Sequence, residues 1–142
     1  MIALSLDYGE RRIGVAISDL QGLTARPLTV ITRESRDKDL ERLRQLAEQF
    51  RAAVIVIGLP LNMDGTESQG ARRARRFANA IRHSLGLEVE LWDERLTTFE
   101  AEQQMLEAGL PPERRKKLRD AVAAAVILQD YLDARRDLRS GI

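Results

Sequence analysis

The stretch LSLDYGERRIGVAISD, residues 4–19, decides the fold because it joins two short apolar runs through a turn. Residues 2–8 and 12–19 alternate with the period of two that is typical of β-strands, and YGERR between them supplies turn residues. We therefore predict a β-hairpin. In its first strand the large apolar residues face one side of the sheet, and the small or polar ones face the other: Ala3, Ser5 and Asp7.

Asp7 is the unusual residue of this hairpin, because it lies near the end of a strand that is otherwise apolar. An ionised carboxylate that is buried without a partner costs several kcal/mol. Either a cation or a set of hydrogen-bond donors must therefore compensate it. A hydrogen-bonded aspartate at a strand end is the structural alternative to a metal ligand.

The remaining sequence alternates strands and helices. Pro27 has no N–H for a ladder hydrogen bond, so the third strand is expected at a sheet edge. Two capping boxes, Thr66 with Gln69 and Thr97 with Glu100, are expected to open helices. The predicted strands after the hairpin are 23–31, 52–58 and 87–92, and helices are predicted at 36–51, from 66 to about 85, from 97 to about 109 and over about 115–137.

This order predicts an α/β fold with a mixed five-stranded sheet, helices on both faces and the first strand in the centre. A length of 142 residues suits a single domain over 1–142. Neither a run of about twenty apolar residues nor a secretory leader is visible, so we expect a soluble, cytoplasmic protein. The absence of cysteine excludes disulfides and thiolate metal sites.

Acidic residues are expected to meet at one edge of this sheet. Asp93 and Glu94 follow the fifth strand, which should run parallel to the first, so both lie on the same rim as Asp7. Asp120 is expected on the sheet-facing stripe of the last helix. Carboxylates without cysteine or a histidine cluster suit Mg²⁺ or Mn²⁺, and two such ions about 4 Å apart can support phosphoryl displacement.

Each acid also has a plain structural interpretation. Asp93 and Glu94 could be a strand terminus and a helix-start charge, and strand parity does not choose between them as a ligand. Asp120 could cap its helix or pair with Arg119 or Lys116. Only the expected convergence of these acids favours a metal site.

Basic residues form two blocks that could neutralise nucleic-acid phosphates, although exposed helices of proteins that bind nothing also carry such charges. The predicted nucleic-acid contacts are Arg72, Arg73 and Arg76 in the second helix, and Arg114, Arg115, Lys116 and Lys117 before the last helix. Arg11 and Arg12 could contact nucleic acid or simply decorate the hairpin turn. The segment from Gly58 to Gly65 could contact substrate or form a structural turn.

The chain resembles the YqgF/RuvX family, relatives of the RuvC Holliday-junction resolvases on the ribonuclease H-like fold. The resemblance covers nearly the whole length and is carried by four segments: LDYGERRIGVAISD, VIGLPLNMDGT, LWDERLTTFEAE and RDAVAAAVILQDYLD.

The resemblance implies a metal-dependent phosphodiesterase whose acidic triad, by motif, is Asp7, Glu94 and Asp120, holding two Mg²⁺ or Mn²⁺ ions. It also implies 5′-end maturation of precursor 16S rRNA as the function, with resolution of branched DNA as the alternative; symmetric cleavage of a four-way junction would call for a homodimer. A ribosome-assembly factor that binds nucleic acid without cutting it is the first rival. The second is an ATP-binding protein with a phosphate-contacting D-x-G turn.

Overall fold

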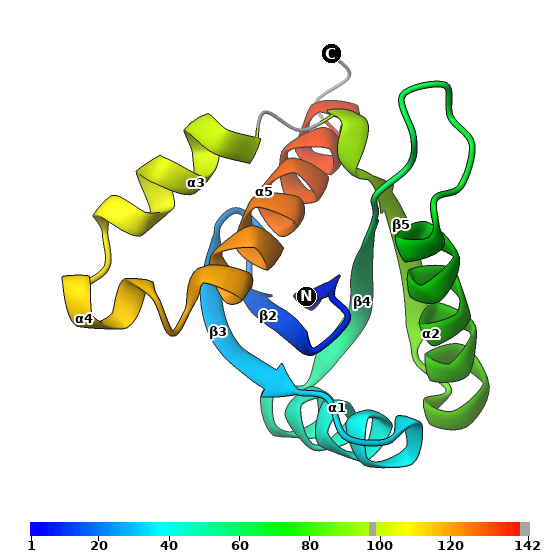
Figure 1. The fold of residues 1–142 in the computed structure, drawn as a ribbon. Coiled ribbons are helices and arrows are strands. Elements are labelled where there is room, and N and C mark those ends of the chain that lie inside the picture. The colour runs from blue at the N-terminus through cyan, green and yellow to red at the C-terminus, as the bar shows by residue number, and fades with distance from the viewer. Residues whose placement is uncertain (97–98, 140–142) are drawn as a thin grey trace.

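The computed structural model describes residues 1–96 and 99–139, which form a five-stranded β-sheet with helices on both faces (Figure 1). The strands are β1 (Ile2–Tyr8), β2 (Arg12–Ser18), β3 (Ala25–Thr32), β4 (Ala52–Leu59) and β5 (Glu88–Asp93). The helices are α1 (Arg36–Phe50), α2 (Gln69–Leu85), α3 (Phe99–Ala108), α4 (Pro112–Arg115) and α5 (Arg119–Arg139), and the 3-10 helix η1 (Glu94–Leu96) follows β5.

The sheet has the order β3-β2-β1-β4-β5, so β1 lies in the centre as predicted. β1 is antiparallel to β2, whereas β4 is parallel to both β1 and β5. Because β1, β4 and β5 run in the same direction, their carboxyl ends lie along one edge of the sheet, where α/β proteins bind ligands. The prediction that Pro27 belongs to an edge strand is confirmed, since β3 pairs only with β2.

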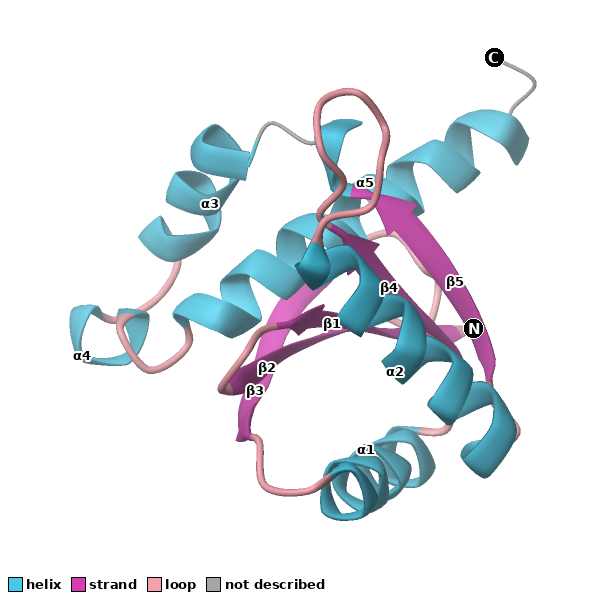
Figure 2. Ribbon diagram, turned by 45° about the vertical axis from the view of Figure 1, so that its right-hand side comes forward, coloured by secondary structure: helices cyan, strands magenta, loops and turns pink. Residues whose placement is uncertain are grey.

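The two faces of the sheet have different cores. Helices α1 and α2 cover one face, where large aliphatic side chains of β1 and β4 pack around Phe77, which is fully buried. Helix α5 covers the opposite face, as the turned view makes clear (Figure 2). The hairpin alternation explains this division, because it directs Leu4 and Leu6 to the first face and Ala3 to the second.

Small residues let the backbone of α5 lie directly against the hairpin. The hydroxyl of Ser5 donates a hydrogen bond to the carbonyl oxygen of Ala124, over 2.6 Å. A Cβ atom at Gly14 would lie only 1.9 Å from the carbonyl oxygen of Asp120, so no larger residue fits there without moving the helix. This close approach fixes the first turn of α5 beside the end of β1.

Two predicted helix starts are wrong. Ser68 caps α2 by accepting a 3.0 Å hydrogen bond from the N–H of Ala71, while the hydroxyl of Thr66 donates to Asp64 within the preceding loop. Helix α5 begins at Arg119 rather than near residue 115. The segment 111–117 before it is exposed, does not pack on the core and contains the separate short helix α4. The other predicted capping box involves Thr97, which lies outside the described residues.

Within these described ranges, none of the helices is both long enough and apolar enough to cross a bilayer.

Candidate active site

Asp7 lies near the carboxyl end of β1, opposite Gly14 of β2 and on the face that α5 covers. It is half-buried there. Burial is the main cause that raises the pKa of Asp7 to about 6, and the negative charge of Asp120 acts in the same direction. The two carboxylates are therefore close enough to repel each other.

Glu94 is the first residue of η1, directly after β5. A Cβ atom at Gly58 would lie 2.6 Å from Oε1 of Glu94, so this carboxylate sits against the backbone of β4. Burial raises the pKa of Glu94 to about 7, with smaller contributions from the charges of Asp7 and Asp93. Glycine at position 58 thus creates the space that the carboxylate fills.

Asp120 opens α5 and is held by Arg12 of β2, whose Nε donates a 2.7 Å hydrogen bond to Oδ2. The sequence-based alternatives had Asp120 capping its helix or pairing with Arg119 or Lys116; the ion pair with Arg12 is the contact found. The hairpin alternation places Arg12 on the same face as Gly14, but only the structure shows that α5 rests on this face.

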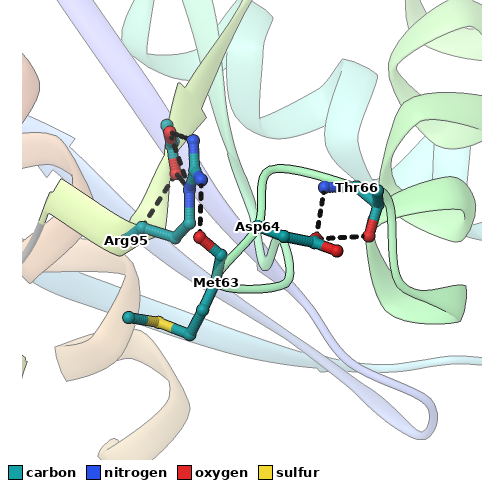
Figure 3. A network of polar contacts seen from close by, with 5 residues as sticks. Met63, Asp64, Thr66 and Arg95 are labelled. Atoms are coloured by element: carbon teal, nitrogen blue, oxygen red, sulfur yellow. Dashed lines mark hydrogen bonds and ion pairs between the residues drawn. The ribbon is translucent and has the colours of Figure 1, made fainter.

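Asp93 has a different environment from its neighbour Glu94, although strand parity could not separate the two. The guanidinium of Arg95 bonds to both carboxylate oxygens of Asp93, at 2.7 Å for the shortest contact, and also donates to the carbonyl oxygen of Met63 (Figure 3). The hydrogen bond from Arg95 holds the pKa of Asp93 below its usual value. Asp93 is thus an ion-pair partner, and Glu94 is the acid that lies against β4.

The negative charge of Asp120 raises the pKa of Asp7, and the negative charge of Asp7 raises the pKa of Glu94. The three acids are therefore successive repelling charges along the sheet edge. Among the described residues, however, no three acidic or histidine side chains form a ready-made metal cluster, and Asp120 bonds to Arg12. The chemistry of the set still fits a hard cation: all its donors are carboxylate oxygens, and neither Asp7 nor Glu94 accepts a hydrogen bond from the described part of the chain. The assignment of the three acids as ligands stays a prediction.

Arg33 is a further residue that sequence reasoning missed. One of its terminal nitrogens donates 2.9 Å hydrogen bonds to the carbonyl oxygens of Gly9 and Glu10, and its guanidinium lies 4.5 Å from the centre of the Tyr8 ring. Arg33 thereby fixes the turn that follows Asp7. No local pattern indicates this contact, because it joins the β1–β2 turn to the end of β3 across the sheet.

The predicted basic contacts lie on two sides of the molecule. Arg72, Arg73 and Arg76 belong to α2, whereas Arg114, Arg115, Lys116 and Lys117 lie in and after α4, which precedes Asp120 (Figure 1). Arg73 reaches the hairpin turn through a 3.4 Å contact with Glu10, and the four residues near α4 are exposed. The loop residues Asn62 and Asp64 bond within their own loop, so they form a structural turn.

The raised pKa values predict an unusual dependence of stability on pH. A carboxyl group whose pKa is higher in the folded than in the unfolded state contributes stability that is present at low pH and is lost as the pH rises. For Asp7 and Glu94 this window extends from about 4 to about 7. Because one pKa unit corresponds to about 1.4 kcal/mol, ionised Asp7 costs the fold ~3 kcal/mol above that window.

We therefore expect the metal-free protein to lose stability between pH 5 and pH 8, as measured by urea unfolding in the presence of a chelator. The Glu94→Gln variant should show a shallower decline, because glutamine does not ionise. Glu88→Gln, at the opposite and exposed end of β5, is the matched control and should retain the wild-type slope. A stability that rises over this interval would contradict the described environment of both acids.

Solved structures with low sequence identity define the fold class of this protein. The chain aligns with RuvC of T. thermophilus in complex with a Holliday-junction substrate, at a TM-score of 0.62 and 16% identity, covering 96% of both chains. It aligns with the fowlpox virus resolvase in complex with Holliday-junction DNA at a TM-score of 0.63 and 10% identity, covering 95% of this chain and 99% of that one. The fold is therefore ribonuclease H-like, as predicted.

A family model narrows this class. The RuvX model, described as a Holliday junction resolvase, matches residues 1–134, and the chain belongs to this family. Relatives named "Putative pre-16S rRNA nuclease" include one from Clostridium botulinum, 47% identical over 94% of this chain and 97% of its own length. Another, from Myxococcus xanthus, is 47% identical over 96% of this chain and 90% of its own length.

Proposed function

We propose that the protein is a divalent-metal-dependent endonuclease that hydrolyses phosphodiester bonds, with the 5′ end of precursor 16S rRNA as its substrate in the cytoplasm. The observation that carries the proposal is the pair of half-buried carboxylates, Asp7 and Glu94, which repel each other at the sheet edge without protein donors among the described residues. A cation bound between the two carboxylates removes the cost of this repulsion. The name shared by relatives supports RNA as the substrate.

Asp7, Glu94 and Asp120 would hold Mg²⁺ or Mn²⁺, in one or two ions. When bound between such carboxylates, these ions polarise phosphoryl oxygens and lower the pKa of a coordinated water. The residues of the chain supply the rest: β1 and the first turn of α5 position two of the acids, Gly58 makes room for the third, and Arg33 fixes the turn beside them.

Arg12 contacts one carboxylate oxygen of Asp120, Oδ2, so a cation at this acid would either bind the other oxygen or displace the guanidinium. The Arg12 side chain is 59% exposed and can turn into solvent, where its charge suits the phosphate backbone of an incoming strand. The arginines of α2 and the basic residues around α4 would add phosphate contacts without base specificity, giving an affinity that falls with salt.

The test of the proposal compares two substrates in Mn²⁺ and in chelator. One is an RNA spanning the 5′ boundary of 16S rRNA, and the other is a synthetic four-way DNA junction. We expect Mn²⁺-dependent cleavage of the RNA near the boundary. Salt-sensitive binding to both substrates without any cleavage would instead favour an assembly factor that does not cut.

Cleavage of branched DNA is the second candidate function, because the family model and the RuvC-like fold point to it. Symmetric cleavage of a four-way junction would require two copies of the chain related by a two-fold axis. Paired incisions in the junction, together with a dimer in solution, would therefore favour this candidate over RNA maturation.

Arg12→Ala provides a separate prediction. Removal of the guanidinium frees Asp120 and removes a positive charge beside the cation, so Mn²⁺ should bind more tightly. Since half-exposed ion pairs contribute up to about 1 kcal/mol, the expected gain in affinity, measured by calorimetric titration without nucleic acid, is about two- to fivefold.

The control for this measurement is Arg44→Ala, which breaks the ion pairs of Arg44 with Glu41 and Glu48 on α1, away from the site. It should bind Mn²⁺ as the wild type does. Weaker binding in Arg12→Ala would mean that Arg12 holds Asp120 in its ligand position rather than competing with the ion.

A further inference from the structure

The loop between β4 and α2 carries a rigid tight turn over residues 62–65. The N–H of Gly65 donates to the carbonyl oxygen of Asn62 over 2.9 Å, and the N–H of Asn62 donates to the carbonyl oxygen of Thr66 over 2.9 Å. Side chains close the turn further, because Asp64 accepts from both the N–H and the hydroxyl of Thr66. Gly65 has a φ of +90°, which a residue with a side chain adopts only at a cost.

Met63 lies at the tip of this turn and is 90% exposed, more than any other large apolar side chain in the described part of the chain. Figure 3 shows its side chain pointing away from the polar contacts of Asp64 and Thr66. Single exposed apolar residues are common on protein surfaces. This one differs because hydrogen bonds on both sides hold its backbone in place, which keeps the residue at the loop tip.

The turn is also attached to the candidate active site. Arg95 donates a 3.2 Å hydrogen bond to the carbonyl oxygen of Met63 while it pairs with Asp93, so its side chain joins the loop tip to the segment that bears Glu94 (Figure 3). A Cβ atom at Gly65 would lie 3.3 Å from this guanidinium, which shows how closely the turn rests on it. The loop tip that bears Met63 is therefore joined through Arg95 to the residue next to Glu94.

We propose that Met63 is an apolar wedge that inserts between nucleobases beside the phosphate held at the acidic site. The inference rests on the proposed nuclease function and adds how the substrate is distorted there. Apolar side chains, methionine among them, unstack base steps when they enter a nucleic acid, and the energy gained by burying the side chain offsets the unstacking cost. The arginines of α2, the helix that follows this loop, supply charges that attract the backbone on either side.

The experiment uses the full chain with Asp7→Asn, which should bind without cutting, and substrates that carry the fluorescent base 2-aminopurine. The base is placed in turn at each position flanking the branch point of a four-way DNA junction and flanking the boundary in the RNA that spans the 5′ end of 16S rRNA. Binding should raise fluorescence at one or two positions, because the base unstacks. Adding Met63→Ala should abolish most of that rise, whereas Met105→Ala, at a methionine 78% exposed on α3, should leave it unchanged.

Cleavage rates of single variants at Met63, measured without Asp7→Asn, complete the test. Met63→Ala should lower kcat by about tenfold, equivalent to about 1.4 kcal/mol, with a smaller change in KM. Met63→Leu should restore the rate and the isosteric but polar Met63→Gln should not. Wild-type cleavage and an unchanged fluorescence rise in Met63→Ala would overturn the wedge.

The two proposals fail in different ways. If the wild type cuts neither substrate, the nuclease function is wrong, yet a fluorescence rise that depends on Met63 would still establish the wedge on a binding protein. If the wild type cuts and Met63 has no influence on rate or fluorescence, only the wedge is wrong.

Discussion

Asp7→Asn is expected to abolish cleavage and at the same time to stabilise the fold. Asparagine keeps the size of the side chain but does not bind a hard cation as a charged carboxylate does. A bound metal stabilises the transition state by several kcal/mol. Loss of about 4 kcal/mol of this stabilisation lowers the rate by about 10³-fold. Unfolding in chelator at pH 8 should, conversely, require more urea than for the wild type.

The gain in stability follows from burial. The pKa of Asp7 is raised to about 6, mainly by burial, so the ionised form destabilises the folded state at pH 8 and its removal relieves that cost. Mn²⁺ should raise the melting temperature of the wild type and have little effect on Asp7→Asn, because binding to the folded state alone shifts its equilibrium. A loss of activity accompanied by a lower melting temperature would indicate a structural role for Asp7 instead.

Asp37→Asn is the matched control, since Asp37 is exposed in the first turn of α1 on the other side of the sheet. It should cut at the wild-type rate and change stability by only a few tenths of a kcal/mol, the usual scale of a helix-dipole contact. If Asp7→Asn retained cleavage while remaining folded, the metal-dependent mechanism would be wrong.

The sequence predicted the sheet because the hairpin alternation carries information about both faces. The same parity that buries Leu4 and Leu6 under α2 places Ala3, Ser5 and Asp7 under α5, and the structure follows it. The first and fifth strands could be placed on one rim because parallel order follows from right-handed crossovers. The approach of Asp120 to Asp7 was thus accessible without coordinates.

The contacts that the sequence did not reveal join segments distant along the chain. The contact of Arg12 with Asp120 depends on which helix covers β2, and that of Arg33 with the β1–β2 turn depends on the pairing of β3 with β2; local propensity encodes neither. The N-cap of α2 is Ser68 and not the predicted Thr66, because the hydroxyl of Thr66 bonds to Asp64 within the loop. Strand parity did not choose between Asp93 and Glu94, and only the family resemblance favoured Glu94; the structure distinguishes the two because Arg95 pairs with Asp93.

Gly14→Ala is expected to be the most damaging small substitution in the fold. The added Cβ would lie 1.9 Å from the carbonyl oxygen of Asp120 and 2.9 Å from the N–H nitrogen of Ala121, and both are backbone atoms that cannot rotate away. Either β2 bends or α5 moves off the sheet. Overpacking a core typically costs about 1–3 kcal/mol, and a clash with two backbone groups should cost at least ~3 kcal/mol, measured by urea unfolding.

Gly109→Ala is the matched control for this prediction, because the nearest atom to its added Cβ would be the carbonyl oxygen of Leu106 at an unstrained 3.5 Å. It should unfold within about 0.5 kcal/mol of the wild type, as surface changes usually do. Where Gly14→Ala still folds, displacement of α5 moves Asp120 away from Asp7, so Mn²⁺ should stabilise the variant less than the wild type. Wild-type stability and an undiminished Mn²⁺ response would show that α5 does not need its close contact with β2 to bring Asp120 to the site.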